Sequence, residues 1–472
     1  MFGSMRLNTS VRNQTADYGL SVNCLLSTVN CQAVALPPCV AYNRSMNPKK
    51  VVRRIVPKQG VRLAEESYRR GRLLVTQARY RFPARDLRVI AVTGTNGKTT
   101  TAMFVNAMLK HADYKTAMLT TAVYEIAGVA KPNHNHRTVP LTSELYAFFR
   151  EAKQKQVDFV IMEATSQALH QHKLHGIPIE VAVMTNLTQD HLDYHGTMRE
   201  YALAKSRLFS RYMNPNYAVL NRDDEWYDFF RKRCVGVATT YGQGVGSDIQ
   251  IQRVKLSQSG SSFTLKVDGA KVPVKVQLPG LFNTYNAAAA AGVGQWLGLD
   301  HTQIADGLGS LDKTPGRMEP VEAGQSFAVI VDYAHAPDAL QNALEALRQV
   351  TKGKLMIVFG ATGDRDKSKR PQMGEVVGKL ADRIFLTDDE TYTEDPARIR
   401  AAVMKGIKKS RAASKTTEVD DREEAIRQAF AEARKGDTVL LAGIGHQNAR
   451  NMGGQDIPWE EPQIAQNLLQ KR

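Results

Sequence analysis

Residues 93–101 have the composition of a loop that binds phosphate. They read Thr-Gly-Thr-Asn-Gly-Lys-Thr-Thr-Thr and stand between an apolar run, 87–92, and an amphipathic stretch, 102–110. A strand, a glycine turn and a helix N-terminus in this order let backbone N–H groups approach phosphate oxygens. Lys98 adds a mobile positive charge, and the hydroxyl of Thr99 can reach Mg²⁺. An ordinary glycine-rich turn is the alternative interpretation.

Further polar side chains follow two other apolar runs. Glu163 follows the run 157–162, and a segment rich in His and Asp, 185–196, follows the run 181–184. The carboxyl ends of parallel strands meet at one edge of a sheet, so these groups are expected beside the phosphate loop. A carboxylate there can hold Mg²⁺, and His and Asp can bind metal or transfer protons. Taken singly, Glu163 is typical of a surface residue, and the segment 185–196 is typical of a polar loop.

These groups need a doubly wound scaffold to bring them together. Short apolar runs of the kind found in buried parallel strands alternate with helical segments through most of the chain. Residues 247–279 instead alternate apolar and polar side chains around Asp268-Gly269, which predicts an antiparallel β insertion. We predict a P-loop-type α/β domain with a mainly parallel sheet over 87–313. After a linker-like Thr-Pro-Gly sequence, a Rossmann-like α/β domain follows over 314–472.

The N-terminal region carries most of the positive charge. The chain of 472 residues has a formal net charge of +16, and residues 1–90 contribute 16 Lys and Arg but only 4 Asp and Glu. The rest is close to neutral, so we expect no specific nucleic-acid partner. We expect a disordered basic extension over 1–45 and a helical lead-in over 46–86, with one basic helix over 61–80. RNA or acidic-lipid binding, a signal peptide and a transit peptide are the alternatives.

Composition and cysteine usage favour a globular protein of a reducing compartment. Apolar residues make up 43% and charged residues 23% of the chain, and no apolar run is long enough for a transmembrane helix. The four cysteines are Cys24, Cys31, Cys39 and Cys234, and their spacing indicates neither a zinc site nor a disulfide framework. We expect a cytoplasmic monomer.

Taken together, the motifs resemble those of the Mur ligase family. In one order and spacing the chain carries T-G-T-N-G-K-T, M-E-A-T-S-Q-A-L-H-Q-H-K, T-N-L-T-Q-D-H-L-D-Y-H-G and Y-x-x-A-K-x-x-L-F. Further matches are G-L-F-N-T-Y-N, P-G-R-M-E, D-Y-A-H-A-P and G-D-R-D-K-S-K-R-P. The resemblance runs from about Leu87 to Gly445. It is strongest to the UDP-N-acetylmuramoyl-tripeptide synthetases, the ligases that add the third residue of the stem peptide.

The resemblance implies a role for each residue at a matching position. The implied ATP site comprises Gly94, Thr95, Asn96, Gly97, Lys98, Thr99, Thr100, Asn283, Arg317, Asp332 and His335. The implied ligands of two Mg²⁺ ions are Thr99, Glu163, His191 and Lys205. Lys205 is implied to be carbamylated by CO₂, which converts a cation into a carboxylate, and it forms the implied catalytic set with Lys98 and His191. The implied substrate contacts are Thr138, Ser166, Gln171 and Lys173 for a muramoyl-peptide-like acceptor, and Arg365, Asp389, Glu390 and Tyr392 for the incoming amino acid.

The activity implied is that of an ATP-dependent, ADP-forming amide ligase in peptidoglycan synthesis. A carboxylate is a poor electrophile, so ATP would first convert the acceptor carboxylate to an acyl phosphate, which the amine of the amino acid then attacks. A folylpolyglutamate- or cyanophycin-type ligase with another acceptor is one alternative. A non-catalytic paralogue that binds ATP is another, and a simple ATPase or kinase would leave the second α/β domain without a role.

Three features of the sequence depart from the family pattern. The family's N-terminal domain, which binds the uridine nucleotide, is not recognisable in residues 1–85. Residues 389–392 read Asp-Glu-Thr-Tyr, where enzymes that add meso-diaminopimelate carry D-N-P-R. Lys173 stands where Arg is usual. Because the arginine that would pair with a distal carboxylate is missing, we expect lysine or another basic diamino acid to be preferred. Arg398 or Arg400, reaching in from a neighbouring helix, is the alternative that would restore such a pairing.

Overall fold

The computed structural model describes residues 58–133, 137–257 and 260–471, with the side chains of 58–65 and of residue 132 left out. Residues 63–472 form one compact unit. The extension predicted over 1–45, and with it three of the cysteines, lies outside the described residues. The predicted basic helix is α2 (Lys58–Arg79), and a 3-10 turn, η2 (Pro83–Asp86), leads from it into the first strand. No helix among the described residues is both long and apolar enough to cross a membrane.

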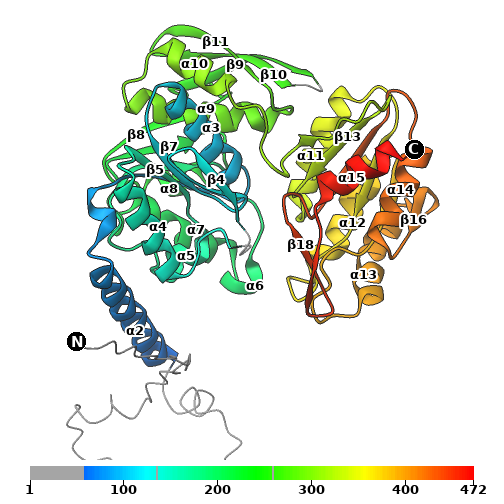
Figure 1. Ribbon diagram of the computed structural model, residues 1–472, viewed down its shortest axis with the longest axis horizontal. Helices are drawn as coiled ribbons and strands as arrows, with labels where there is room; N and C mark the ends of the chain where they lie inside the picture. The colour runs from blue at the N-terminus through cyan, green and yellow to red at the C-terminus, as the bar shows by residue number, and fades with distance from the viewer. Residues whose placement is uncertain (1–57, 134–136, 258–259, 472) are drawn as a thin grey trace, which may run out of the picture. The chain divides into compact units, whose positions relative to one another are not determined.

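The middle domain is built on an eleven-stranded sheet (Figure 1). Its strand order is β11-β10-β9-β8-β7-β6-β1-β5-β2-β3-β4. The strands that run parallel are β1 (Arg88–Thr93), β2 (Thr116–Leu119), β5 (Phe159–Glu163), β6 (Ile179–Met184), β7 (Tyr217–Asn221), β8 (Val237–Gly242) and β9 (Ile249–Ser257). Two short antiparallel strands, β3 (Val123–Ile126) and β4 (Val129–Pro132), close one edge. The mainly parallel sheet predicted from the sequence is therefore confirmed.

Helices cover both faces of this sheet. In β1, Val89 and Ala91 pack into one core while Ile90 and Val92 pack into the other, as the two-residue period of a strand requires. The first core includes side chains of α4 (Thr142–Gln154), α5 (Ser166–His170) and α7 (Met198–Ser206). The second includes side chains of α3 (Lys98–His111), α9 (Leu281–Trp296) and α10 (His301–Gly309). Figure 1 shows these two groups of helices on opposite sides of the strands.

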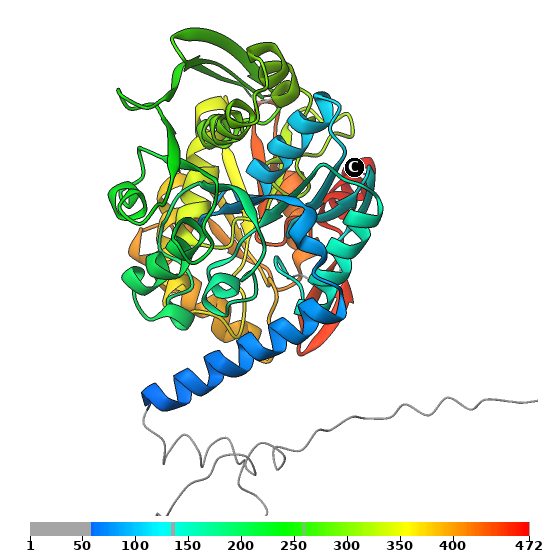
Figure 2. The same ribbon diagram turned by 90° about the vertical axis from the view of Figure 1, so that its left-hand side faces the viewer.

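The predicted β insertion consists of β9, β10 (Gly260–Val267) and β11 (Ala270–Val276), in which β10 runs antiparallel to both of its neighbours. Asp268 and Gly269 connect β10 to β11 with φ of 50° and 81°, the conformation of a two-residue type I′ hairpin. The insertion is continuous with the main sheet, because β9 pairs in parallel with β8. In Figure 2 these strands, coloured green, lie over the helices with which they pack, α9 and α10.

The C-terminal domain has a six-stranded sheet of its own, in the order β12-β13-β17-β14-β15-β16. Its strands are β12 (Glu319–Pro320), β13 (Ala328–Asp332), β14 (Leu355–Phe359), β15 (Arg383–Leu386), β16 (Thr416–Glu418) and β17 (Thr438–Ala442), and all but β12 are parallel. Helices α11 (Pro337–Val350), α12 (Lys369–Leu380), α13 (Pro396–Lys409), α14 (Arg422–Glu432) and α15 (Glu461–Gln470) pack with it. The hairpin of β18 (Ala449–Met452) and β19 (Gln455–Pro458) completes the domain. This is the second α/β domain predicted from the sequence.

Candidate active site

The phosphate loop joins β1 to α3, and its two glycines have no substitute. Gly94 has φ of 153°, and a Cβ there would lie 1.8 Å from the Thr185 hydroxyl oxygen. Gly97, the N-cap of α3, has φ of 80°, and a Cβ there would lie 2.3 Å from Asn286 Oδ1. Both positions therefore need glycine for its left-handed conformation and for its lack of a side chain. The N-terminus of α3 opens at this loop, which is the arrangement that binds phosphate.

Two lysines meet at the carbonyl of Gly94. Lys98 Nζ donates to Gly94 O at 3.1 Å and to Thr95 O at 2.8 Å, and Lys205 Nζ donates to the same Gly94 oxygen at 2.6 Å. Burial lowers the pKa of Lys98 and holds the pKa of Lys205 well below its usual range, to which the charge of Lys98 contributes. The Lys205 ammonium nitrogen also lies 4.6 Å from the centre of the Tyr201 ring. Lys205 is thus 2% exposed inside the site.

Glu163 is a buried acceptor at the end of β5. Its Oε1 accepts from the Thr99 hydroxyl at 2.8 Å and from the Thr121 amide at 2.7 Å, and its Oε2 accepts from the Thr121 hydroxyl at 3.2 Å. Among the described residues, no three His, Cys, Asp or Glu side chains gather into a metal-binding group. Thr99 and Glu163 still fit Mg²⁺, because this ion commonly binds through one or two protein oxygens with water and substrate phosphates supplying the rest.

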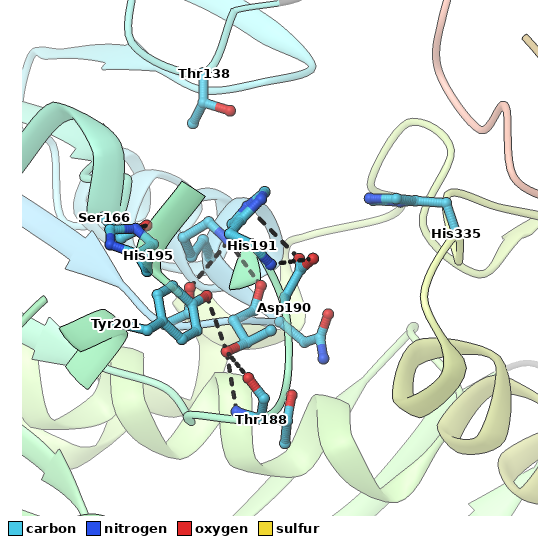
Figure 3. Close-up of polar contacts among 12 residues, drawn as sticks. Thr138, Ser166, Thr188, Asp190, His191, His195, Tyr201 and His335 are labelled. Carbon is cyan, nitrogen blue, oxygen red and sulfur yellow. Dashed lines mark hydrogen bonds and ion pairs between the residues drawn. The ribbon is translucent and has the colours of Figure 1, made fainter. Parts of the chain in front are cut away.

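The His- and Asp-rich segment is hydrogen-bonded to the phosphate loop, since the Thr188 amide donates to the Thr95 hydroxyl at 3.0 Å. Figure 3 shows Asp190 and His191 of this segment. Asp190 Oδ1 accepts from the amide of His191, and Asp190 Oδ2 lies 3.6 Å from His191 Nε2. Burial lowers the pKa of His191, and Lys205 and Lys98 act in the same direction against the raising effect of Asp190. His191 is therefore held towards its neutral form, the form that binds metal.

A cavity of about 430 Å³ extends from the phosphate loop into the C-terminal domain. Its lining includes Lys98, Glu163, Asn283, Arg317, Asp332 and His335. Arg317 Nε is buried without a hydrogen-bond partner in the described part of the chain, so it suits an anionic ligand such as a phosphate. Burial lowers the pKa of His335 to about 3, so its ring is neutral. Figure 3 shows His335 approaching the Asp190–His191 pair from the side opposite Ser166 and His195.

Asp332 and Asn283 are held by the protein itself. The two oxygens of Asp332 accept from the amides of Met318 and Ala334, at 2.7 and 2.8 Å. Asn283 Nδ2 donates to Pro279 O at 2.7 Å, and Asn283 Oδ1 accepts from Asn286 at 3.0 Å. Asp332 thus fixes the turns that carry Arg317 and His335.

The predicted acceptor residues do not form a single cluster. Thr138 is linked to the Glu163 cluster through Thr121, whose hydroxyl lies 2.8 Å from the Thr138 hydroxyl. Ser166 Oγ lies 2.9 Å from His195 Nε2, and Gln171 Nε2 donates to the Tyr194 hydroxyl at 3.1 Å. Burial lowers the pKa of Lys173, and the nearby charges of Arg137 and Arg72 lower it further. The structure does not bring Lys173 into contact with the other three.

Of the predicted amino-acid residues, Asp389, Glu390 and Tyr392 lie in the loop after β15, and Arg365 lies in the loop after β14. The Arg365 guanidinium lies 5.2 Å from the centre of the Tyr392 ring, and the Tyr392 hydroxyl lies 3.5 Å from Glu390 Oε1. Burial raises the pKa of both Asp389 and Glu390. Arg400 bonds Asp388 and Glu418, and the side chain of Arg398 is 87% exposed, so neither supplies the missing cation.

Three residues of the site were missed by sequence reasoning. Thr121 bonds Glu163, Asn286 abuts Gly97, and Asp338 bonds Asn96 of the phosphate loop. Thr121 and Asn286 carry no signal in the sequence beyond the motifs that contain or flank them. Asp338 follows the His-Ala-Pro motif in the first turn of α11, where an acidic residue is ordinary because it complements the helix dipole.

Comparisons with known proteins agree with this geometry. The Mur ligase middle domain family matches residues 92–294, and the family described as Mur ligase, glutamate ligase domain matches residues 316–445. The chain is 38% identical over 410 residues to the UDP-N-acetylmuramoyl-L-alanyl-D-glutamate–2,6-diaminopimelate ligase of Geobacillus kaustophilus, covering 86% of this chain and 83% of the relative. The enzyme of the same name from Syntrophomonas wolfei is 40% identical over 392 residues, covering 83% and 80%.

Solved structures give the same result. A diaminopimelate ligase of the same name aligns with a TM-score of 0.58 at 34% identity, over 81% of this chain and 78% of the other. Mycobacterium tuberculosis folylpolyglutamate synthase aligns with a TM-score of 0.65 at 19% identity, over 79% and 92%, and shares the fold alone. The chain belongs to the Mur ligase family.

Proposed function

We propose that this Mur ligase adds an amino acid to a UDP-N-acetylmuramoyl-peptide-like precursor of peptidoglycan, and that it converts ATP to ADP and phosphate in the same reaction. The observation that carries the proposal is the meeting of Lys98 and Lys205 at Gly94 O, beside the Thr99–Glu163 pair. A phosphate loop that only binds or hydrolyses ATP needs the first lysine and has no use for a second, buried amine. Relatives that are 38–40% identical are named as ligases of such a precursor.

In this reaction the phosphate loop would hold the phosphates of ATP. Lys98, Arg317 and the first N–H groups of α3 offset the negative charge as the acceptor carboxylate approaches the γ-phosphate. Mg²⁺ would be held by Thr99 and Glu163 and would neutralise phosphate charge. The acceptor carboxylate takes the γ-phosphoryl group and ADP leaves. The amine of the amino acid then attacks the acyl carbon, forms the amide, and releases phosphate and a proton.

Burial lowers the pKa of Lys205 and so favours the neutral amine, the form that reacts with CO₂. A protonated amine cannot be carbamylated. We propose that Lys205 is carbamylated in the active enzyme. The modified side chain would bring an anion close to Lys98 and would assist Glu163 and His191 at the metal site.

Basic side chains favour an anionic acceptor. Arg137 precedes Thr138 in the loop before α4, and its charge, with that of Arg72, acts on Lys173 in the turn after α5. A peptide acceptor that ends in carboxylates complements this charge. We place the reaction in the cytoplasm, where ATP is available.

The proposal is tested by phosphate release across a panel of acceptors and amino acids. We expect release to require ATP, a UDP-N-acetylmuramoyl-dipeptide and an amino acid together. Lys98→Ala should lower the rate on the order of 10²-fold or more, because one preorganised charge is lost. Lys110→Ala, on the same helix and paired with Glu125 on the surface side, is the matched control. Release that needs neither acceptor nor amino acid, or a preference for a folate or polyglutamate acceptor, would refute the proposal.

A further inference from the structure

Asp338 lies in the first turn of α11 and joins the C-terminal domain to two loops of the middle domain. Its Oδ2 accepts a hydrogen bond from Asn96 Nδ2 at 2.6 Å and a second one from the hydroxyl of Thr188. Asn96 belongs to the phosphate loop, and Thr188 lies between β6 and His191. A single carboxylate oxygen therefore touches both the phosphate loop and the segment that carries Asp190 and His191.

The two segments are already bonded to one another. The amide of Asn96 donates to Asn186 Oδ1 at 2.9 Å, and the Thr185 hydroxyl donates to Asn96 O at 2.6 Å. The amide of Thr188 donates to the hydroxyl of Thr95 at 3.0 Å. A displacement of either segment is thus passed to the other, and Asp338 acts on the pair as a unit.

On the other side, Asp338 is fixed to residues that line the cavity. His335 precedes it by three residues, and Asn342 follows one helical turn later on α11. The position of the N-terminus of α11 relative to the phosphate loop therefore determines where His335, and the turn that Asp332 holds, lie around the ATP phosphates. Misplacement of such groups by about 1 Å is enough to lower a rate on the order of 10²-fold.

Helix stability alone does not account for an acidic residue at this place. Asp338 Oδ1 is shielded from solvent and has no hydrogen-bond partner among the described residues, which is an unfavourable state for a carboxylate oxygen. Glu423 occupies the same position, the second residue of a helix in the same domain, on α14. Glu423 is exposed, so an acidic side chain at this position complements the helix dipole without being buried.

We propose that Asp338 is a positioning residue that holds the C-terminal domain in register with the phosphate loop through Asn96 and Thr188. The proposal rests on the ligase function given above. The hydrogen bonds of Asp338 go to Asn96 and Thr188, and none goes to Lys98, Thr99 or Glu163. Its loss should therefore lower kcat and leave the affinity for ATP nearly unchanged, because Lys98, Thr99 and the loop amides remain.

The test compares Asp338→Ala, Thr188→Val and the double variant, with Glu423→Ala as the control for removing an acidic residue from the second position of a helix. We expect kcat to fall about tenfold or more in Asp338→Ala, with the Kd for ATP within about threefold of the wild type. The double variant should be no slower than Asp338→Ala, since both changes break one contact. Glu423→Ala should have the wild-type kcat. Should Asp338→Ala fail to fold, Asp338→Asn, of equal volume, takes its place.

Hydrogen exchange of residues 94–98 and 185–190 in the resting enzyme gives a readout that needs no ligase activity. Exchange should be faster in Asp338→Ala than in the wild type, and unchanged in Glu423→Ala. Wild-type kcat and exchange in Asp338→Ala, additive losses in the double variant, or equal effects in Glu423→Ala would each overturn the inference. If the wild-type enzyme forms no amide, the proposed function fails, and exchange alone still decides whether the contact orders the loop.

Discussion

Lys98 and Lys205 both donate to the carbonyl oxygen of Gly94, at 3.1 and 2.6 Å. Two ammonium groups that share one oxygen at these distances repel each other. Burial resolves the conflict by favouring a neutral amine, and it acts most strongly on Lys205. A neutral amine reacts with CO₂, and the resulting carbamate would be attracted to Lys98. The two buried lysines are therefore expected to become one cation and one anion when the enzyme is active.

The first residue-level prediction follows for Lys205. Lys205→Ala should be inactive and should be partly rescued by a short-chain carboxylic acid. The acid restores the anionic group but lacks its covalent link to the protein. Activity of the wild type should fall as the pH is lowered, because protonation of the amine opposes carbamylation, and added bicarbonate should reduce that loss. An unmodified Lys205 in an intact mass or a well-resolved density map, obtained with CO₂ present and without acid, would contradict this.

The second residue-level prediction concerns the amino acid added. Glu390 and Asp389 attract a distal ammonium and repel a distal carboxylate, and Tyr392 offers one neutral hydrogen bond where an arginine is usual. Arg400 is committed to Asp388 and Glu418. We expect lysine or another basic diamino acid to be used in preference to meso-diaminopimelate. The measurement is kcat/KM for both amino acids with one acceptor. A preference of about tenfold or more for meso-diaminopimelate would show the prediction to be wrong; the names of the relatives specify 2,6-diaminopimelate.

Among the secondary-structure elements, helices α14 and α15 are joined by a buried ion pair. Arg422 and Glu461 are both fully buried, and the Arg422 Nε donates to both carboxylate oxygens, at 3.2 and 2.9 Å. The indole of Trp459 also donates to Glu461 at 2.6 Å. A buried ion pair adds little stability compared with a well-packed apolar pair in its place. Removing only one partner, however, leaves an unpaired charge in the core.

The prediction at this scale is that Glu461→Ala lowers the free energy of unfolding by about 3–5 kcal/mol. The double variant Arg422→Met with Glu461→Leu should recover most of the loss. Glu424→Ala, which removes an exposed partner of Arg427 on the same helix, is the control and should change stability little. Midpoints of urea unfolding give the comparison. A double variant as unstable as Glu461→Ala would contradict the idea that the unpaired charge causes the loss.

Elements with a local signature could be predicted from the sequence, and elements defined by pairing could not. The Asp268-Gly269 turn and the apolar runs of β1, β5 and β6 follow from turn chemistry and residue type. Strands β3 and β4 are four residues long, too short to show a period. The phosphate loop, Glu163 and His191 were found because each follows a recognisable strand, whereas Thr121 lies in an unremarkable loop after β2.

For the whole molecule, the site depends on contacts between residues far apart in the chain. Asn96 and Asp338 are separated by 242 residues, and His446 lies 3.2 Å from Thr121 O across 325 residues. Local patterns carry no information about such pairs, so the two domains could be predicted but not the surfaces by which they meet. Both domains contribute to the lining of the one cavity described above.

One prediction belongs to the N-terminal segment. Residues 1–45 have no periodic apolar pattern and contain three of the four cysteines, so they should add little to the core. A shortened chain that begins at Met46 should melt within a few degrees of the full chain and should keep its activity. Loss of folding or of activity on truncation would show that the segment is structural or that it binds the acceptor. Thermal unfolding and phosphate release, measured side by side, distinguish these two results.

The measurement that tests the central claim most directly follows the oxygen of the acceptor. If ATP activates the acceptor carboxylate, one carboxylate oxygen becomes the bridge of an acyl phosphate and leaves with phosphate when the amine attacks the acyl carbon. With the terminal carboxylate of the acceptor labelled with ¹⁸O, and with ATP and the amino acid present, each phosphate released should carry one labelled oxygen. Unlabelled phosphate, released at the same rate, would mean that water attacks ATP and that the protein is not a ligase of this kind.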